Sequence, residues 1–96
     1  MARAQRFFKA EFSEQWMKSY PHFQAAEQKG IDKVVMALLK GDTTPGMRIK
    51  PIEPEKYFYE ARVNDGDRVV HRIANDTVYF VDVVAHDDIS RYGTRR

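Results

Sequence analysis

The chain has 96 residues, a mass of 11.2 kDa and a formal net charge of +2 at pH 7. This length predicts one compact domain spanning residues 1–96 and excludes two. With 43% apolar residues, a mean hydropathy of -0.62 and no long apolar run, the sequence predicts a globular protein with one core and excludes a membrane-spanning one. Cysteine is absent, which excludes disulfides, thiolate metal cages and cysteine nucleophiles.

Charge at the two ends of the chain bears on location and partners. Arg3 and Arg6 interrupt the first eight residues, which therefore lack the apolar core of a signal peptide, and we expect a cytoplasmic protein. The last six residues contain Arg91, Arg95 and Arg96 and no acid. Such a tail suits an anionic partner, and it equally suits a purely solubilising role.

The first half of the chain predicts a short strand and two helices. Residues 5–12 can form the strand, after which Ser13 can cap the first helix. Pro21 disfavours helical geometry at the preceding residue and predicts a break at residues 19–21. The second helix is predicted to end at Gly41, and its apolar residues have the spacing i, i+3, i+4, i+7: Ile31, Val34, Val35 and Leu38.

The second half predicts an antiparallel meander with tight turns at residues 64–67 and 75–76. Pro51 and Pro54 place the first strand of the meander at a sheet edge. The predicted fold is α+β, with the two N-terminal helices packed on one face of a twisted antiparallel sheet. Its predicted meander strands are residues 47–52, 57–63, 68–73 and 78–85.

Alternation along these strands predicts two different faces of the sheet. Arg48 is expected to share a face with Lys50, and Glu60 with Arg62. On the third meander strand, one face is predicted to hold Val69, His71 and Ile73, and the other Arg68, Val70 and Arg72. One face would pack on the helices and the other would carry cations. A cationic face suits nucleic acid, and an ordinary solvated sheet face accounts for it equally well.

Few motifs in the sequence suggest a catalytic centre. The run His86-Asp87-Asp88 lacks the third and fourth ligands of a metal site, and we expect neither a metal nor another cofactor. His71 lies between apolar residues of the same parity, which favours a core position. Ser13 and Ser90 lack the glycine-rich elbow of a triad hydrolase. Arginine, histidine and tyrosine together can cleave RNA without metal, because they can supply a base, a cation for the phosphorane and an acid.

Three stretches, in this order and spacing, resemble the RelE/ParE toxin superfamily of bacterial toxin–antitoxin systems. The most specific is residues 61–71, with the pattern of an arginine, a turn, a glycine, any residue, an arginine and two hydrophobic residues. The others are residues 75–79, an acidic turn into the last strand, and residues 83–87 followed by Tyr92. The resemblance covers most of the chain and implies the same α+β fold.

The resemblance also implies a function and a site. The expected activity is metal-independent, ribosome-dependent cleavage of mRNA by an endoribonuclease toxin whose partners are a cognate antitoxin, the ribosome and mRNA. The family pattern maps onto Arg68 as the cation for the scissile phosphate, His86 as the proton-transfer group, and Tyr92 as a base-stacking or acid-assisting residue. Because Arg68 is expected on the solvated face, alanine there is predicted to leave stability nearly unchanged. The expected RNA-binding residues are Arg48, Lys50, Arg62, Arg72 and Arg91.

The chain departs from the family on the strand before the turn. The namesake of the family has two lysines there, where this chain has Phe58 and Glu60. Other members use a carboxylate, which makes Glu60 a candidate base. The departure keeps two alternatives open: an inhibitor of DNA gyrase like the ParE branch, and a toxin that has lost activity. A noncatalytic RNA-binding or adaptor module, whose basic face only neutralises phosphates, is a third hypothesis.

Overall fold

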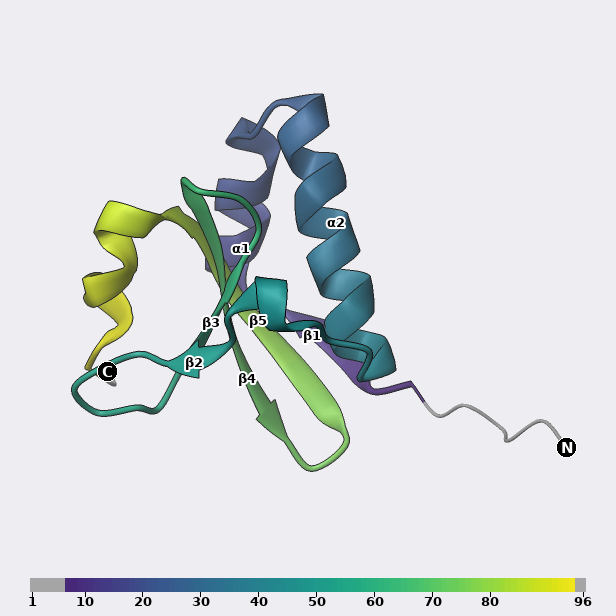
Figure 1. Ribbon diagram of the computed structural model, residues 1–96, viewed down its shortest axis with the longest axis vertical. Coiled ribbons are helices and arrows are strands. Elements are labelled where there is room, and N and C mark those ends of the chain that lie inside the picture. Colours follow the sequence, from purple (N-terminus) through teal and green to yellow (C-terminus); the bar gives the residue numbers. More distant parts are fainter. Residues whose placement is uncertain (1–6, 95–96) are drawn as a thin grey trace, which may run out of the picture.

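The computed structural model describes residues 7–94, and Figure 1 shows its α+β fold. Predictions that concern Arg3, Gln5, Arg6, Arg95 and Arg96 lie outside the described residues. The helices are α1 (Glu14–Ser19) and α2 (Ala25–Lys40), with three short 3-10 helices, η1 (Tyr20–His22), η2 (Pro45–Met47) and η3 (His86–Tyr92). The strands are β1 (Lys9–Phe12), β2 (Lys50–Pro51), β3 (Tyr59–Arg62), β4 (Asp67–Ala74) and β5 (Thr77–Ala85).

The five strands form one sheet in the order β1-β5-β4-β3-β2. Strands β2 to β5 are antiparallel as predicted, whereas β1 runs parallel to β5, so the prediction of a wholly antiparallel sheet is wrong. Strand direction depends on pairing: β1 pairs with β5 near the other end of the sequence, and no local pattern in residues 5–12 encodes that partner. The predicted edge position of Pro51 is confirmed, because β2 is the last strand of the sheet.

The N-terminal half follows its local sequence signals closely. Ser13 caps α1, its side chain accepting a hydrogen bond of 3.0 Å from the backbone N–H of Trp16. The predicted break is present, because α1 ends at Ser19 and Pro21 lies in η1. Helix α2 ends as predicted at Gly41, which adopts a left-handed conformation (φ 69°) that glycine accepts without a steric penalty.

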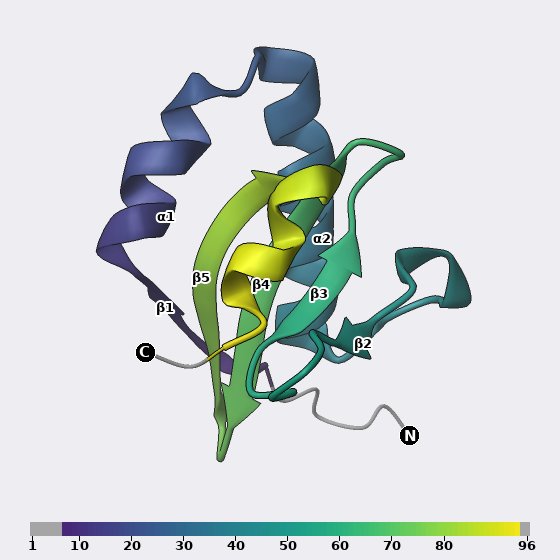
Figure 2. The same ribbon diagram turned by 90° about the vertical axis from the view of Figure 1, so that its left-hand side faces the viewer.

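The main core lies between the sheet and the two helices. Ile31, Leu38, Val69 and Phe80 have no more than 1% of their surface exposed in this layer. The ring of Trp16 packs between Phe80 at 5.4 Å and Tyr20 at 6.1 Å, which joins α1 to β5. Figure 1 shows both helices on one side of the sheet and η3 on the other, and in Figure 2 η3 lies in front of the sheet with α2 behind it.

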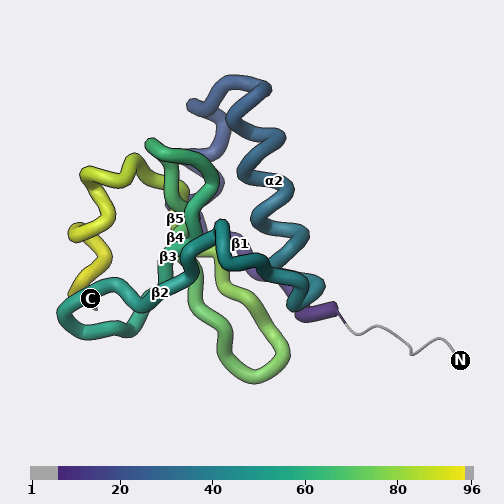
Figure 3. The backbone as a smooth tube through the Cα atoms, in the orientation of Figure 1, coloured from purple at the N-terminus to yellow at the C-terminus, as the bar shows by residue number. Residues whose placement is uncertain are grey.

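A second, smaller core lies under η3 on the opposite face. Ile52, Val70 and Val84 are buried there, and Ile89 and Tyr92 of η3 pack against them. The C-terminal segment is also joined to the loop between β2 and β3, where the N–H of Glu55 donates to the carbonyl of Gly93 at 3.0 Å (Figure 3). A Cβ at Gly93 would overlap the carbonyl oxygen of Glu53, so this close approach requires glycine. The expectation of a single core is therefore corrected to two.

The first meander strand is shorter than predicted. Residues 47–52 were expected to be extended, yet only Lys50–Pro51 pair in the sheet, Met47 belongs to η2, and Arg48 is left-handed with φ 46°. The expectation that Arg48 shares a strand face with Lys50 is wrong because the left-handed turn ends the alternation before β2. Among the described residues, no helix is long and apolar enough to cross a membrane.

Candidate functional site

The predicted faces of β4 are confirmed by the sheet register. Val69 packs in the main core and Val70 in the second core, which places Arg68 and Arg72 on the side of η3. The register shifts on β5, where Asp82 pairs with Val70 and Phe80 with His71, leaving Val81 as an extra residue. The alternation of β4 itself is unbroken. Glu60 and Arg62, opposite Val70 and Arg68, lie on the same η3-side face as predicted.

Arg68 lies on the expected face but is not a solvated side chain. Only 13% of the side chain is exposed, and its Nε lies 3.5 Å from a carboxylate oxygen of Glu60, which is itself 8% exposed. Its Nη1 donates to the backbone carbonyls of Asn64, Asp65 and Asp67 at 2.7, 3.2 and 3.0 Å. The predicted small effect of alanine on stability is therefore revised: Arg68 holds the β3–β4 turn closed and neutralises a buried carboxylate.

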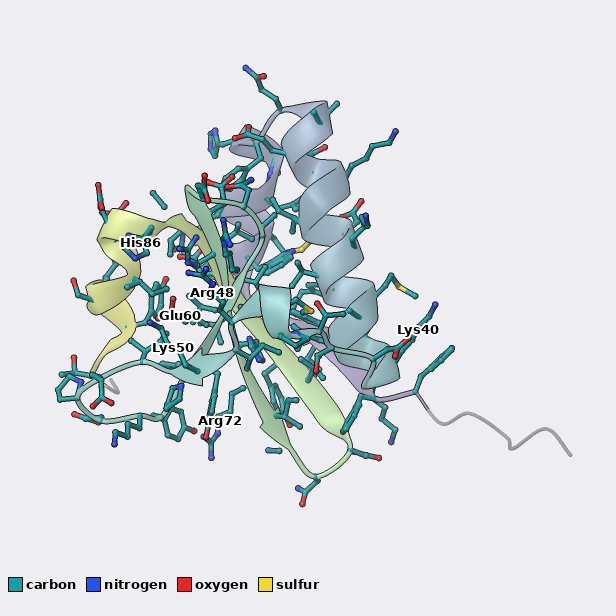
Figure 4. All side chains as sticks on the ribbon, viewed as in Figure 1. Lys40, Arg48, Lys50, Glu60, Arg72 and His86 are labelled. Carbon is teal, nitrogen blue, oxygen red and sulfur yellow. The ribbon has the colours of Figure 1, made fainter. Side chains whose placement is uncertain are left out.

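Lys50, Glu60 and Arg68 form a cluster at the β2–β3–β4 side of this face, named here the basic cluster. Lys50 lies directly across from Glu60 in the register, and Glu60 is paired with Arg68. A pocket of about 400 Å³ lies against it, lined by Lys50, Glu60, Ile89 and Ser90 among others. Figure 4 shows Lys50, Glu60 and His86 on the side of the sheet that η3 covers. The basic cluster thus places a lysine and a carboxylate in the lining of a concave surface, and Arg68 is joined to it through its ion pair with Glu60.

His86 lies where β5 ends and η3 begins. Its side chain is 57% exposed, and its Nδ1 is 3.7 Å from a carboxylate oxygen of Asp87. Its backbone N–H donates to the carbonyl of Gly66 at 2.7 Å, which fixes it beside the β3–β4 turn. The turn also holds Arg68, so the structure brings the predicted histidine and arginine to the same end of the sheet. An exposed imidazole at this place can exchange protons with a bound substrate.

Tyr92 is packed rather than free. Its hydroxyl donates a hydrogen bond to Asp82, and its ring contacts Phe58 edge-on at a centroid distance of 6.0 Å. Burial and the Asp82 carboxylate raise the pKa of the Tyr92 phenol above its usual range. Asp82 is 1% exposed and otherwise accepts only the N–H of Val83 among the described residues. The structure thus favours a positioning role, in which Tyr92 ties η3 to β5, over direct proton donation.

We predict that Tyr92→Phe lowers the free energy of unfolding by about 1 to 2 kcal/mol, because it leaves a buried carboxylate oxygen of Asp82 without its donor. Urea denaturation measures the change. Tyr79→Phe is the matched control, since the side chain of Tyr79 is exposed and has no hydrogen-bonded hydroxyl among the described residues. Equal stability of the two variants would contradict the assigned contact.

The five predicted RNA-binding residues differ in whether their side chains have a partner within the protein. Within residues 7–94, Arg48 and Lys50 are exposed and pair with no carboxylate. Arg62 pairs with Asp65, Arg91 lies 3.6 Å from Asp88, and Arg72 donates to the carbonyl of Tyr57 at 2.7 Å. The structure does not gather all five: Arg72 lies towards the other end of the sheet from His86 (Figure 4).

Sequence analysis missed Asp82, the buried carboxylate that holds Tyr92. A signal was present, since Asp82 is the only charged residue between Thr77 and Ala85 in an apolar strand. In the described part of the chain, no three His, Asp or Glu side chains lie close enough together to hold a metal ion. The predicted core position of His71 is confirmed, because it is 2% exposed.

Comparisons with known proteins identify the fold. No family model matches the sequence, and no curated protein matches it. Among solved structures, the DinJ–YafQ toxin–antitoxin complex of E. coli matches with a TM-score of 0.73 and 16% identity, covering 88% of this chain and 96% of that one. A copper-bound mutant toxin from Helicobacter pylori matches with a TM-score of 0.71 and 15% identity, covering 84% and 97%. The toxin–antitoxin complex RelBE2 of Mycobacterium tuberculosis matches with a TM-score of 0.66 and 16% identity, covering 83% and 99%.

Proposed function

We propose that this protein is the toxin of a type II toxin–antitoxin pair and that it inhibits translation by cleaving mRNA on the ribosome. Its fold is shared by toxins from three bacteria over more than four-fifths of the chain. The observation that carries the proposal is the basic cluster of Lys50, Glu60 and Arg68, in which Lys50 and Glu60 line a pocket, with His86 at the same end of the sheet. This set contains the group types that RNA cleavage requires.

In the proposed reaction the ribose 2′-oxygen attacks the adjacent phosphorus while the bond from phosphorus to the 5′-oxygen breaks. A base removes the proton of the 2′-hydroxyl, an acid protonates the departing 5′-oxygen, and the products are a cyclic phosphate and a free 5′-hydroxyl. Arg68 stabilises the phosphorane: Glu60 and the β3–β4 turn engage its Nε and Nη1, and its Nη2, which has no acceptor among residues 7–94, donates to the phosphate. His86 transfers a proton, and Glu60 is the second candidate for that role.

Tyr92 takes part by orienting η3 rather than by reacting. Because its hydroxyl is held by Asp82, its contribution is to keep His86, at the start of η3, beside the β3–β4 turn. Lys50 of the basic cluster and Arg48 are both exposed, and they attract the mRNA phosphates that flank the cleaved bond. The proposed reaction uses no metal or cofactor, since arginine and lysine neutralise the charge that develops on the phosphate.

The proposed partners are a cognate antitoxin, the ribosome and mRNA. Two of the similar structures are toxin–antitoxin complexes, which supports an antitoxin as partner here. An antitoxin that covers the η3-side face or displaces η3 would block the basic cluster. With these partners, the proposed location of the protein is the cytoplasm.

Inducing the protein alone in bacteria is expected to stop incorporation of labelled amino acids before incorporation of thymidine, and primer extension is expected to show cleaved mRNA. His86→Ala is expected to reduce cleavage about a hundredfold or more, because it removes a proton-transfer group. The matched control is His22→Ala, since His22 is an exposed histidine in η1. If thymidine incorporation stops first, the target is DNA gyrase and the proposal is wrong. Equal toxicity of both histidine variants would remove His86 from the site.

A further inference from the structure

The η3-side face carries a second pocket away from the basic cluster. It has a volume of about 600 Å³, within the range of small-molecule sites, and Glu11, Tyr57, Arg72 and Tyr79 are among its lining residues. The register pairs Glu11 with Tyr79 and Tyr79 with Arg72, so these three side chains form one row across β1, β5 and β4. Figure 4 shows Arg72 far along the sheet from His86. The pocket is thus separate from the proposed cleavage site.

The middle of the row is a flat aromatic surface. Tyr79 is 39% exposed, although it lies within a strand whose neighbours on the other face are buried. Beside it, the Arg72 guanidinium stacks on the ring of Tyr57 with its Cζ 4.0 Å from the centroid, and Nη1 donates to the carbonyl of Tyr57 at 2.7 Å. Arg72 is therefore held in one orientation, and its other guanidinium N–H groups have no hydrogen-bond acceptor within residues 7–94.

Opposite charges stand at the two ends of the row. Glu11 is exposed on β1 and has no ion-pair or hydrogen-bond partner for its side chain within residues 7–94. Because neighbouring strands are about 4.8 Å apart, the Cα atoms of Glu11 and Arg72 are separated by about 10 Å, with Tyr79 between them. A planar group the width of a purine can lie on Tyr79 with one edge towards Glu11 and the other towards Arg72.

We propose that this pocket binds a guanine base of a single-stranded RNA. Tyrosine rings and arginine planes stack on bases of any identity, and the polar ends of the row select among them. Guanine has two N–H donors on its Watson–Crick edge, which match the carboxylate of Glu11, and two acceptors, O6 and N7, which match the N–H groups of Arg72. Adenine has only one donor group for Glu11 and, of the two acceptors, only N7 for Arg72. Pyrimidines are too narrow to reach both Glu11 and Arg72.

The inference rests on the proposed function in that the base would belong to the mRNA that is cut at the basic cluster. The pocket and the basic cluster lie on one face of the sheet, so a single strand can pass from one to the other. The carboxylate of Glu11 repels phosphate. The ribose and phosphate of the bound nucleotide would therefore point towards Arg72 and the basic cluster. The pocket would then favour mRNA with a guanine at a fixed distance from the cut.

Binding of 5′-GMP, 5′-AMP, 5′-CMP and 5′-UMP to the purified protein, followed by NMR titration of backbone amides, tests the proposal without ribosomes. We expect 5′-GMP to bind more tightly than the other three and to shift the amides of residues 72 and 79. Tyr79→Ala is expected to weaken 5′-GMP binding about tenfold, because it removes the stacking surface. Glu11→Gln is expected to lower the preference for 5′-GMP over 5′-AMP about tenfold, because the amide replaces one acceptor by a donor.

Two matched controls lie elsewhere on the molecule. Tyr59 is 38% exposed on β3 but pairs with His71 on the helix-side face, so Tyr59→Ala should leave 5′-GMP binding unchanged. Glu14→Gln, in α1 and outside the pocket, controls for loss of one negative charge. Equal affinity for all four nucleotides, or equal effects of the two tyrosine variants, would overturn the proposal.

The outcomes separate this inference from the proposed function. Toxicity and mRNA cleavage without selective 5′-GMP binding would overturn the guanine pocket alone. Selective binding that depends on Tyr79, in a protein that does not inhibit translation, would overturn the proposed function and leave the base-binding pocket. Shifts of the same amides by an antitoxin but by no nucleotide would assign the pocket to a protein partner and overturn the inference.

Discussion

Arg68→Ala is expected to destabilise the protein by about 3 kcal/mol and to abolish toxicity. The side chain of Glu60 is 8% exposed, so removing the guanidinium leaves a buried carboxylate without its counter-charge. The same change removes the donor to three carbonyls of the β3–β4 turn. The cleavage rate should fall at least a hundredfold in the remaining folded protein, because the phosphorane loses a fixed cation. Urea denaturation and growth after induction measure the two effects.

Arg62→Ala is the matched control for stability. Arg62 lies directly opposite Arg68 in the register, and its partner Asp65 is 96% exposed, so its loss should cost less than about 0.5 kcal/mol. A double variant, Glu60→Gln with Arg68→Met, separates folding from catalysis: it should recover much of the lost stability and remain nontoxic. An Arg68→Ala protein as stable as the Arg62→Ala protein would show that the ion pair is not structural. A stable, fully toxic Arg68 variant would remove Arg68 from the site.

Acidification from pH 6.5 to pH 4 is expected to reduce the stability of the protein by about 3 kcal/mol through His71 alone. Burial lowers the pKa of His71 to about 4, and a backbone contact with Val69 offsets only part of this effect. An unfolded chain takes up this proton near pH 6.5, whereas the folded protein takes it up only near pH 4. The unfolded state therefore binds more protons in this window, so stability is full above pH 6.5 and falls as the pH is lowered towards 4.

Comparison of variants isolates this effect from the titration of carboxylates. His71→Leu should reduce the loss of stability between pH 7.5 and pH 4.5, measured by urea denaturation at each pH, because leucine has no proton to bind. His22→Leu serves as the control, since His22 is exposed and lies outside the core. An unchanged pH dependence in His71→Leu would show that the buried imidazole is not the group responsible.

Local signals in the sequence determined the elements that depend on near neighbours. Ser13 caps α1, Gly41 ends α2, and β3 and β4 meet at the predicted turn, because each depends on the conformational preference of one or two residues. Alternation correctly assigned Val69 and Arg68 to opposite faces, since successive side chains of a strand point in opposite directions. The α+β class followed from the same patterns.

Tertiary packing decided what each face does. Alternation predicted Arg68 on a solvated face opposite Val69, but the position of Glu60 on the neighbouring strand makes it part of a buried ion pair. Alternation could not show that η3 folds back over this face and that Asp82 ties Tyr92 to β5, because these contacts join different segments of the chain. The row of Glu11, Tyr79 and Arg72 likewise exists only because β1 pairs with β5 in parallel. Such contacts depend on strand partners and register, which are set by the free energy of the whole packed chain and not by any local run of residues.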